Sequence, residues 1–442
     1  MREIVTFHVG NCGNQIGRQF WELIADEHGI DSGGHFVGHH QLQAERLNVY
    51  FNEGRNRFIA RAVCLDGDPE GIARLQNYPS GKLFNPENMV AGFSSNDNNF
   101  AKGYFTEGAE LMDIVLESAR KEAESCDLLQ GFQIVHSIGG GTGSGTTALL
   151  VKNLAEEYPD NLISTYTVIP SPKVSNIVVE PYNSILGLPQ LIENTHMTCC
   201  YDNDALHDIC VKTLKLSAAS YNDMNFIISH TIAGLTACFR FPGQLNSDLH
   251  KLYTNMVPFP NYHFFVPSFA PLMSTHRAKM TKLTVAEIVY QVFNSNNWLV
   301  SCDTARGKFL TAAAVFRGRM SPKEVDVQMK NVQRKNQNYF VEWIPNNIKS
   351  AICDIPPKGL KMSATFIANI TSVQHVFHRL HKQFDALFRR RGHVHWYIGE
   401  GMEEAEIIEA GNSVKQFFKG YQGLEAEKDS SEESLLCGSL DI

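Results

Sequence analysis

The sequence has no long hydrophobic run, no cysteine pair at metal-binding spacing and no excess of positive charge. No stretch approaches the roughly 18 consecutive apolar residues of a membrane-spanning helix. The ten cysteines include no Cys-x-x-Cys pair, which disfavours a zinc site and, at 442 residues, a disulfide framework. The formal net charge of −8 disfavours binding to nucleic acid through phosphate neutralisation. We therefore expect a soluble cytoplasmic protein with free thiols that binds neither membranes nor nucleic acid.

The first half of the chain alternates between strand-like and helix-like segments. Apolar runs at 3–10, 57–66, 132–138 and 162–170 are separated by stretches with apolar residues at helical spacing. Strands that alternate with helices predict a mainly parallel sheet with helices on both faces. The predicted fold class is therefore α/β, and ligands of such sheets bind at the carboxyl ends of the strands.

A glycine-rich stretch follows the third apolar run. Residues 139–145, GGGTGSG, contain five glycines and come directly before a helix-like segment that begins at Thr146. Such a turn lets backbone N–H groups approach the oxygens of a phosphate, and the helix start adds the positive end of its dipole. The pattern is neither the P-loop motif nor GxGxxG. A merely flexible turn is the alternative interpretation.

Two further loops follow strands of the same predicted sheet. GNCGNQIG, residues 10–17, follows the first strand and offers a second set of backbone donors. LDGDPE follows the second strand, and its Asp66 and Asp68 are candidates to hold Mg²⁺ through water. An acidic pair in a turn is, taken alone, more often simply solvated. Three such loops at one edge of a sheet together predict a nucleotide site.

The character of the sequence changes near Phe226. We expect residues 1–225 to form the nucleotide-binding domain, 226–372 a core helix and a second, mixed α/β domain, and 373–424 a C-terminal helical region. Residues 425–442 hold six acidic residues and one lysine, a composition typical of a disordered tail.

Several motifs together resemble those of the tubulin family. They are GGGTGSG, GNCGNQIG, VIPSPKVS with VVEPYN, RFPGQLN and FVEWIPNN, and the resemblance runs from residue 1 to about residue 421. Two features are more similar to β-tubulin than to α-tubulin. Lys251 stands where α chains carry the glutamate that promotes GTP hydrolysis, and the segment 353–363 lacks the insertion of α chains.

The resemblance assigns roles to individual residues. Guanine recognition falls on Asn203 and Asn225, which suits a carboxamide because it both donates and accepts hydrogen bonds. Without the resemblance, Asn203 would be interpreted as a capping or turn residue. Tyr221 stacks on the base, and Asp68 is the carboxylate on the magnesium side. The phosphate contacts fall on Asn11, Cys12, Ser137, Gly141, Thr142 and Gly143.

The function that the resemblance implies is the β subunit of an αβ-tubulin heterodimer in the microtubules of the cytoskeleton, with GTP and Mg²⁺ as cofactors. In the family, the segment 243–251 of one subunit docks over the nucleotide of the next, so hydrolysis needs the glutamate of a neighbouring α subunit. Further implied partners are lateral tubulin neighbours, microtubule-associated proteins and motors.

Two alternatives stay open. One is a divergent tubulin that binds GTP and α-tubulin but regulates polymers rather than builds them. The other is a metabolic dinucleotide enzyme, which the absence of GxGxxG from the sequence disfavours.

The chain departs from the family pattern on its working loops. Asn11 replaces a glutamine, Asp68 a glutamate and Asn176 an aspartate near the ribose, and the segment 273–282 differs from the usual lateral-contact loop. Asp97 replaces a glycine in the loop that senses the γ-phosphate. We expect its carboxylate to repel that phosphate and so to weaken discrimination between GTP and GDP.

Overall fold

The fold is built on one large sheet. The computed structural model describes residues 2–54, 56–245, 248–273, 283–302, 307–336, 339–341, 343–344 and 346–436, without the side chains of 244, 245 and 426–436. Within these residues eleven strands share the sheet, and the first seven in spatial order run parallel. They are β5 (Met89–Ala91), β4 (Ala62–Asp66), β1 (Glu3–Val9), β6 (Leu129–Ser137), β7 (Leu162–Ile169), β8 (Met197–Asp202) and β10 (Phe264–Ala270). The predicted parallel sheet is confirmed.

The remaining strands make the second half of the sheet mixed in strand direction, which the sequence did not predict. β10 pairs antiparallel with β13 (Met362–Ile370), which pairs antiparallel with β11 (Phe309–Gly318). β12 (Ile348–Cys353) is parallel to β11, and β9 (Gly243–Leu245) closes the edge antiparallel to β12. Because β8 and β10 pair directly, both halves share this one sheet.

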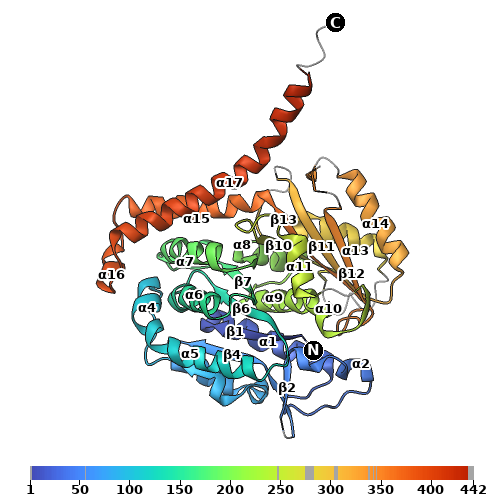
Figure 1. Ribbon diagram of the computed structural model, residues 1–442, viewed down its shortest axis with the longest axis horizontal. Helices are drawn as coiled ribbons and strands as arrows, with labels where there is room; N and C mark the ends of the chain where they lie inside the picture. Colours follow the sequence, from blue (N-terminus) through green and yellow to red (C-terminus); the bar gives the residue numbers. More distant parts are fainter. Residues whose placement is uncertain are drawn as a thin grey trace.

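Helices cover both faces of the parallel half (Figure 1). α1 (Gly10–His28), α3 (Pro69–Asn77) and α9 (Tyr221–Leu235) contribute to one buried apolar cluster, whereas α5 (Glu107–Glu124), α6 (Thr147–Glu157) and α7 (Glu180–Asn194) contribute to another. β1 separates the two clusters, because Val5 and Phe7 belong to one and Ile4 to the other. α10 (Ala237–Arg240), α11 (Leu249–Met256), α13 (Val285–Phe293) and α14 (Pro322–Lys335) pack against the mixed half.

Helix α9 joins the two halves of the molecule. It begins at Tyr221 beside the first half and packs along its length against strands β10, β11 and β13 of the second half. Most of its residues are buried, as expected of a core helix that is apolar on nearly all sides. The expected boundary at residue 225 therefore falls inside a continuous helix.

The chain ends in helices that lie outside the sheet. α15 (Gln374–Phe388) and α17 (Glu404–Leu436) are joined through the short α16 (Val394–Gly399) (Figure 1). The segment between α1 and β4 forms the short helix α2 (Gln41–Ala44) and a separate sheet of β2 (Phe51–Glu53) and β3 (Phe58–Ala60). None of the described helices is long and apolar enough to span a bilayer.

The last helix runs into the acidic segment 425–442, whose expected disorder stays a prediction. α17 continues as a helix to Leu436 and leaves the body of the molecule (Figure 1), whereas residues 437–442 lie outside the described part of the chain. Between Leu424 and Leu436 the sequence has no glycine or proline. Because each added residue of an existing helix gains one hydrogen bond, a helix that is already formed extends through such a segment.

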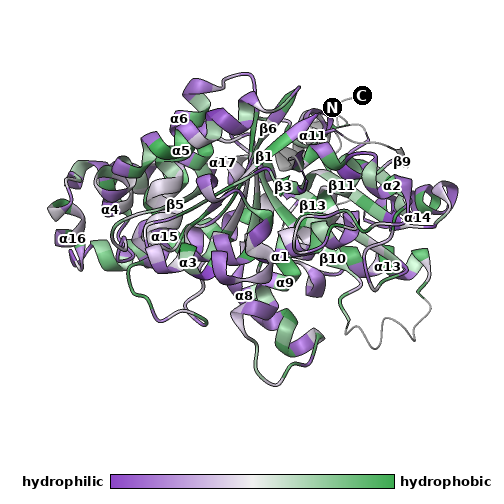
Figure 2. Cartoon of the chain, turned by 90° about the horizontal axis from the view of Figure 1, so that it is seen from below, coloured by the Kyte–Doolittle hydropathy of each residue, from purple (hydrophilic) through white to green (hydrophobic). Residues whose placement is uncertain are grey.

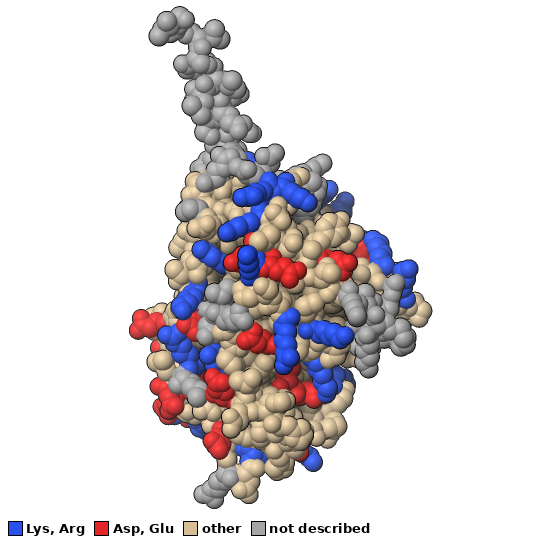
Figure 3. Space-filling view, turned by 90° about the vertical axis from the view of Figure 1, so that its right-hand side faces the viewer, with Lys and Arg blue, Asp and Glu red and all other residues tan. Residues whose placement is uncertain are grey.

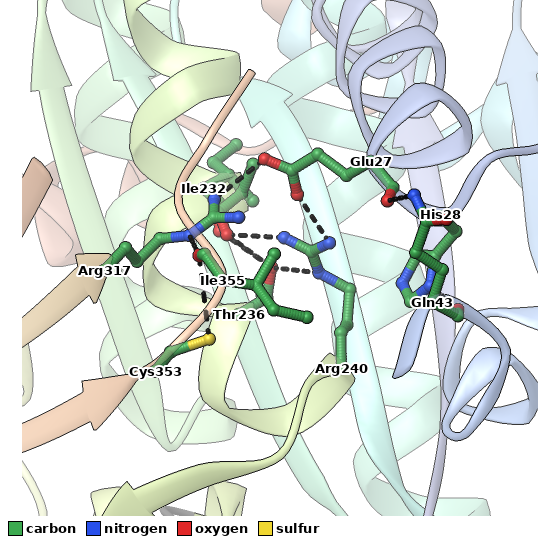
Figure 4. A network of polar contacts seen from close by, with 10 residues as sticks. Glu27, His28, Gln43, Ile232, Thr236, Arg240, Arg317, Cys353 and Ile355 are labelled. Carbon is green, nitrogen blue, oxygen red and sulfur yellow. Dashed lines mark hydrogen bonds and ion pairs between the residues drawn. The ribbon is translucent and has the colours of Figure 1, made fainter. Parts of the chain in front are cut away.

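Three buried charged side chains tie the first helix to the mixed half (Figure 4). Glu27 of α1 accepts hydrogen bonds from Arg240 of α10 at 2.7 Å and from Arg317 of β11 at 2.8 Å, and no side chain of the three is more than 2% exposed. Burial raises the pKa of Glu27, but the two guanidinium groups outweigh it and lower this pKa to about 2. The network therefore holds one negative charge against two positive charges.

Candidate functional site

A cavity of about 430 Å³ lies at the carboxyl ends of β1, β4, β6, β7 and β8. This is the edge of the sheet at which the fold class predicts a ligand. All ten residues that the sequence assigned to the site line this one cavity: Asn11, Cys12, Asp68, Ser137, Gly141, Thr142, Gly143, Asn203, Tyr221 and Asn225. Asn176, expected near the ribose, is exposed and is not among the lining residues.

The start of α1 forms one wall of the cavity. Gly10 begins the helix with a φ of 72°, a conformation that favours glycine, and no described side chain caps the first turn. The first backbone N–H groups of α1 are therefore available to an anion. A Cβ on Gly10 would lie 3.4 Å from the backbone nitrogen of Gly143, so the first loop packs closely on the glycine stretch. The Cys12 thiol also lines this wall, and burial raises its pKa to about 12.

The glycine stretch is closely packed, which contradicts its interpretation as a merely flexible turn. A Cβ on Gly143 would lie 2.4 Å from the carbonyl oxygen of Ser137, and one on Gly145 would lie 2.3 Å from that of Phe100. Residues Thr142–Thr146 form a π-helical turn that leads into α6, and such turns are frequent at functional sites. Glycine is required here because backbone segments approach one another directly.

His136 lies near the end of β6 and contacts the backbone of the glycine stretch. Burial lowers the pKa of His136 to about 4, so its ring is neutral at physiological pH. Its Nδ1 lies 2.8 Å from the carbonyl oxygen of Gly143, and its Nε2 lies 2.9 Å from the hydroxyl of Thr167. This histidine could not be predicted from the sequence, because the Thr167 hydroxyl that contacts its Nε2 lies on the neighbouring strand β7.

The loop 94–99 closes the phosphate end of the cavity. Asn96 donates a hydrogen bond to the Thr142 hydroxyl at 2.9 Å, and Asp97 and Asn98 have φ values of 45° and 55°. The Asp97 carboxylate forms an ion pair at 2.9 Å with Lys102 of α4 (Phe100–Phe105), and its side chain is 73% exposed. The Lys102 ammonium therefore offsets the charge of Asp97, and the expected repulsion of a γ-phosphate stays a prediction.

Two carboxylates stand at the end of β4. Asp68 caps α3, and its Oδ1 accepts a hydrogen bond from the backbone N–H of Glu70 at 3.0 Å. Asp66 is buried, and burial raises its pKa to about 6; its Oδ2 has no hydrogen-bond partner among the described residues. No group of three or more potential metal-binding His, Cys, Asp or Glu side chains occurs in the described part of the chain. A cation at this place would therefore take most of its ligands from bound phosphate and water.

The other end of the cavity is lined by side-chain amides. Asn225 is 6% exposed and donates to Gln15 at 3.4 Å, while Gln15 donates to Asn11 at 2.9 Å. Asn203 opens helix α8 (Asn203–Asp208), and the ring of Tyr221, at the start of α9, is available for stacking because 53% of that residue is exposed. The sequence analysis missed Gln15, which lies one helical turn after Asn11 and links the two ends of the cavity.

Glu180 is a further lining residue that the sequence analysis missed. It lies in the first turn of α7 and accepts a hydrogen bond from the Ser175 hydroxyl at 2.7 Å. Burial raises the pKa of Glu180.

Comparison with protein-family models gives two matches. Residues 3–211 match the Tubulin/FtsZ family, GTPase domain, and residues 260–382 match the Tubulin C-terminal domain. The first match contains the strands and loops that form most of the cavity wall, and the second contains strands β10 to β13 of the mixed half.

Proposed function

The chain belongs to the tubulin superfamily and is a tubulin-like GTP-binding protein, and on that premise we propose that it is the β subunit of an αβ-tubulin heterodimer that builds microtubules. The observation that carries the proposal is the single cavity in which all ten expected residues meet. The protein would then be located in the cytoplasmic cytoskeleton. Its partners would be lateral tubulin neighbours, microtubule-associated proteins and motors.

The residues present fit a guanine nucleotide and Mg²⁺. The first turn of α1 and the glycine stretch offer backbone donors to phosphate, and Asn203 and Asn225 offer amides to the base. The free Oδ2 of Asp66, with Asp68 beside it, suits a divalent cation that is also bound by phosphate oxygens. When bound, the cation would offset negative charge on the phosphates.

The position of Lys251 supports hydrolysis across a subunit boundary. Lys251 lies on α11, and Figure 2 places α11 on the opposite side of the molecule from α8, whose first residue lines the cavity. A residue at this position therefore lies away from the cavity of its own chain, and in a head-to-tail polymer it would face the nucleotide of the next subunit. An α partner would thus supply the glutamate, and hydrolysis would follow assembly.

The carboxylates that line the cavity leave the orientation of the attacking water to a neighbouring subunit. Asp68 caps a helix, Asp97 pairs with Lys102 and Glu180 accepts from Ser175, while Asp66 is placed for the cation. Each of these side chains already has a contact or a proposed role, which favours a residue of a neighbouring subunit as the group that orients the attacking water.

The test is GTP-dependent sedimentation of the chain purified together with an α-tubulin. We expect guanine nucleotide in the purified complex and polymer in the pellet with GTP but not with GDP. A complex that holds guanine nucleotide yet never sediments, and that changes the assembly of ordinary tubulin, would replace the proposal by the regulatory alternative. A complex without guanine nucleotide would refute both.

A further inference from the structure

A short region near the C-terminus is strongly basic although the chain as a whole is acidic. Residues 374–399 contain five Lys or Arg, five His and one acidic residue, Asp385, whereas the net charge of the chain is −8. The Lys and Arg positions are 379, 382, 389, 390 and 391, and the His positions are 375, 378, 381, 393 and 395.

This region lies beside the middle of the last helix. α15 and α17 run side by side along the outside of the molecule (Figure 1). Thr371, before the start of α15, donates to Glu425 of α17 at 2.5 Å, and Arg391, after the end of α15, pairs with Glu404 at 2.9 Å. The two helices are therefore antiparallel, and the middle of α17 lies next to the middle of α15.

The exposed side chains of both helices form one surface, which we name the basic face. The ring of Phe418 in α17 lies 5.4 Å from that of His378 and 5.6 Å from that of His381, which places the two helices in direct contact here. The basic face consists of His375, His378, His381, Lys382, Lys415 and Lys419. All of these residues are exposed except His381, which is half-buried.

The cations of this face are free of ion pairs. Neighbouring arginines are already used, since Arg379 pairs with Asp202 and Arg389 with Asp385. In contrast, Lys382, Lys415 and Lys419 form no ion pair with any residue that the structure describes. Their charge is therefore available to a partner.

Acidic residues limit the basic face at both ends. Glu403, just before α17, and Glu406 and Glu409 on its first turns are exposed, and the acidic segment that starts at Glu425 follows the face. At about 1.5 Å per residue, the stretch from Lys415 to Lys419 is only about 6 Å long. An extended polyanion, such as a nucleic acid or an anionic membrane, would meet the acidic flanks as well and be repelled.

We propose that the basic face is a docking site for a short acidic segment of a partner protein. Unpaired exposed cations attract such a segment and orient it, and the acidic flanks fix its register by repulsion. The affinity depends strongly on salt, because these charges are exposed; the Debye length falls from about 30 Å at about 0.01 M to about 8 Å at about 0.15 M.

The test measures binding of a labelled acidic peptide to the full-length protein by fluorescence anisotropy. The probe has the sequence of residues 425–442 of this chain, with serine in place of its cysteine, and the control peptide has Gln and Asn in place of Glu and Asp. We expect the double variant Lys415→Glu, Lys419→Glu to bind the acidic peptide at least about tenfold more weakly at low salt.

The matched control is the double variant Lys323→Glu, Lys330→Glu on α14. Figure 3 shows the face of the molecule that carries α14, where Lys and Arg side chains alternate with Asp and Glu, and both lysines are exposed there. This variant should bind the peptide as the unmodified protein does. Equal loss in both variants, or unchanged binding after reversal of Lys415 and Lys419, would overturn the proposal. So would binding of a single-stranded DNA of equal charge as tightly as the peptide. If the charge reversal disturbs folding, the double variant Lys415→Gln, Lys419→Gln should still bind the acidic peptide more weakly than the unmodified protein does, with a smaller loss of affinity.

Discussion

Replacing Glu27 with glutamine should destabilise the protein by about 3–5 kcal/mol, because it removes the only anion of the buried network and leaves two guanidinium groups uncompensated. The pKa of Glu27 gives an independent magnitude. It falls from 4.5 to about 2, and at about 1.4 kcal/mol per unit the ionised form contributes about 3 kcal/mol. Because the folded pKa is the lower one, this contribution is complete above pH 4.5 and is lost as the pH falls toward 2.

The variant Arg317→Met tests the charge balance of the buried network more directly. It leaves Glu27 and Arg240 as a one-to-one pair and removes the Nη2 of Arg317, a buried group without a hydrogen-bond partner. It should therefore cost less than Glu27→Gln. The assay is denaturant unfolding of the full-length variants at neutral pH, compared through midpoints at equal slope. Glu117→Gln, which breaks an exposed ion pair on α5, is the control and should leave the midpoint nearly unchanged. If Arg317→Met costs as much as Glu27→Gln, or more, the reasoning from charge balance is refuted.

Three further predictions concern the cavity. Asn225→Asp should shift preference away from GTP in competition with ATP and XTP, because a carboxylate cannot donate a hydrogen bond to the guanine carbonyl. Asn222→Asp, on the exposed side of the same helix, is the control and should leave the preference for GTP unchanged. An unchanged preference in Asn225→Asp would remove the assignment. Gly143→Ala should lower nucleotide affinity at least about tenfold, since its Cβ would lie 2.4 Å from a backbone oxygen and strain of this kind costs about 1–3 kcal/mol. Gly399→Ala is the control in the same titration, because Gly399 does not line the cavity and a Cβ there would meet nothing within 4 Å. Asp97→Gly should raise the ratio of GTP to GDP affinity, because it removes one negative charge from the cavity lining. The same ratio in both proteins would mean that this loop position is neutral.

The sequence was sufficient to predict the parallel sheet and the place of the site. Glycine turns and polar side chains directly after parallel strands meet at one sheet edge, which is where the cavity lies. The roles of Asn203, Tyr221 and Asn225 came from the resemblance to the tubulin family, because local pattern alone would make Asn203 a capping or turn residue. The sequence predicted strands and helices in the second half but neither the order nor the direction of those strands.

Contacts between distant segments were not predictable. The Glu27–Arg317 pair joins residues 290 positions apart, and Asn225 meets Gln15 across 210 positions, without any periodic signal in the sequence. The ion pair of Asp97 with Lys102 was missed for a different reason, because a loop with two left-handed residues decides which way its side chains point. Residues 274–282 of the altered segment 273–282 lie outside the described residues, and the effect of this segment on lateral contacts stays a prediction.

The central claim is that this chain binds GTP and depends on a neighbouring subunit to hydrolyse it. The most direct measurement is GTP turnover by the purified complex with α-tubulin, recorded below and above the concentration at which polymer forms. We predict bound GTP with almost no turnover below that concentration, and phosphate release that rises in step with polymer above it. Equal turnover per complex at both concentrations would contradict the account, because hydrolysis would then need no neighbour.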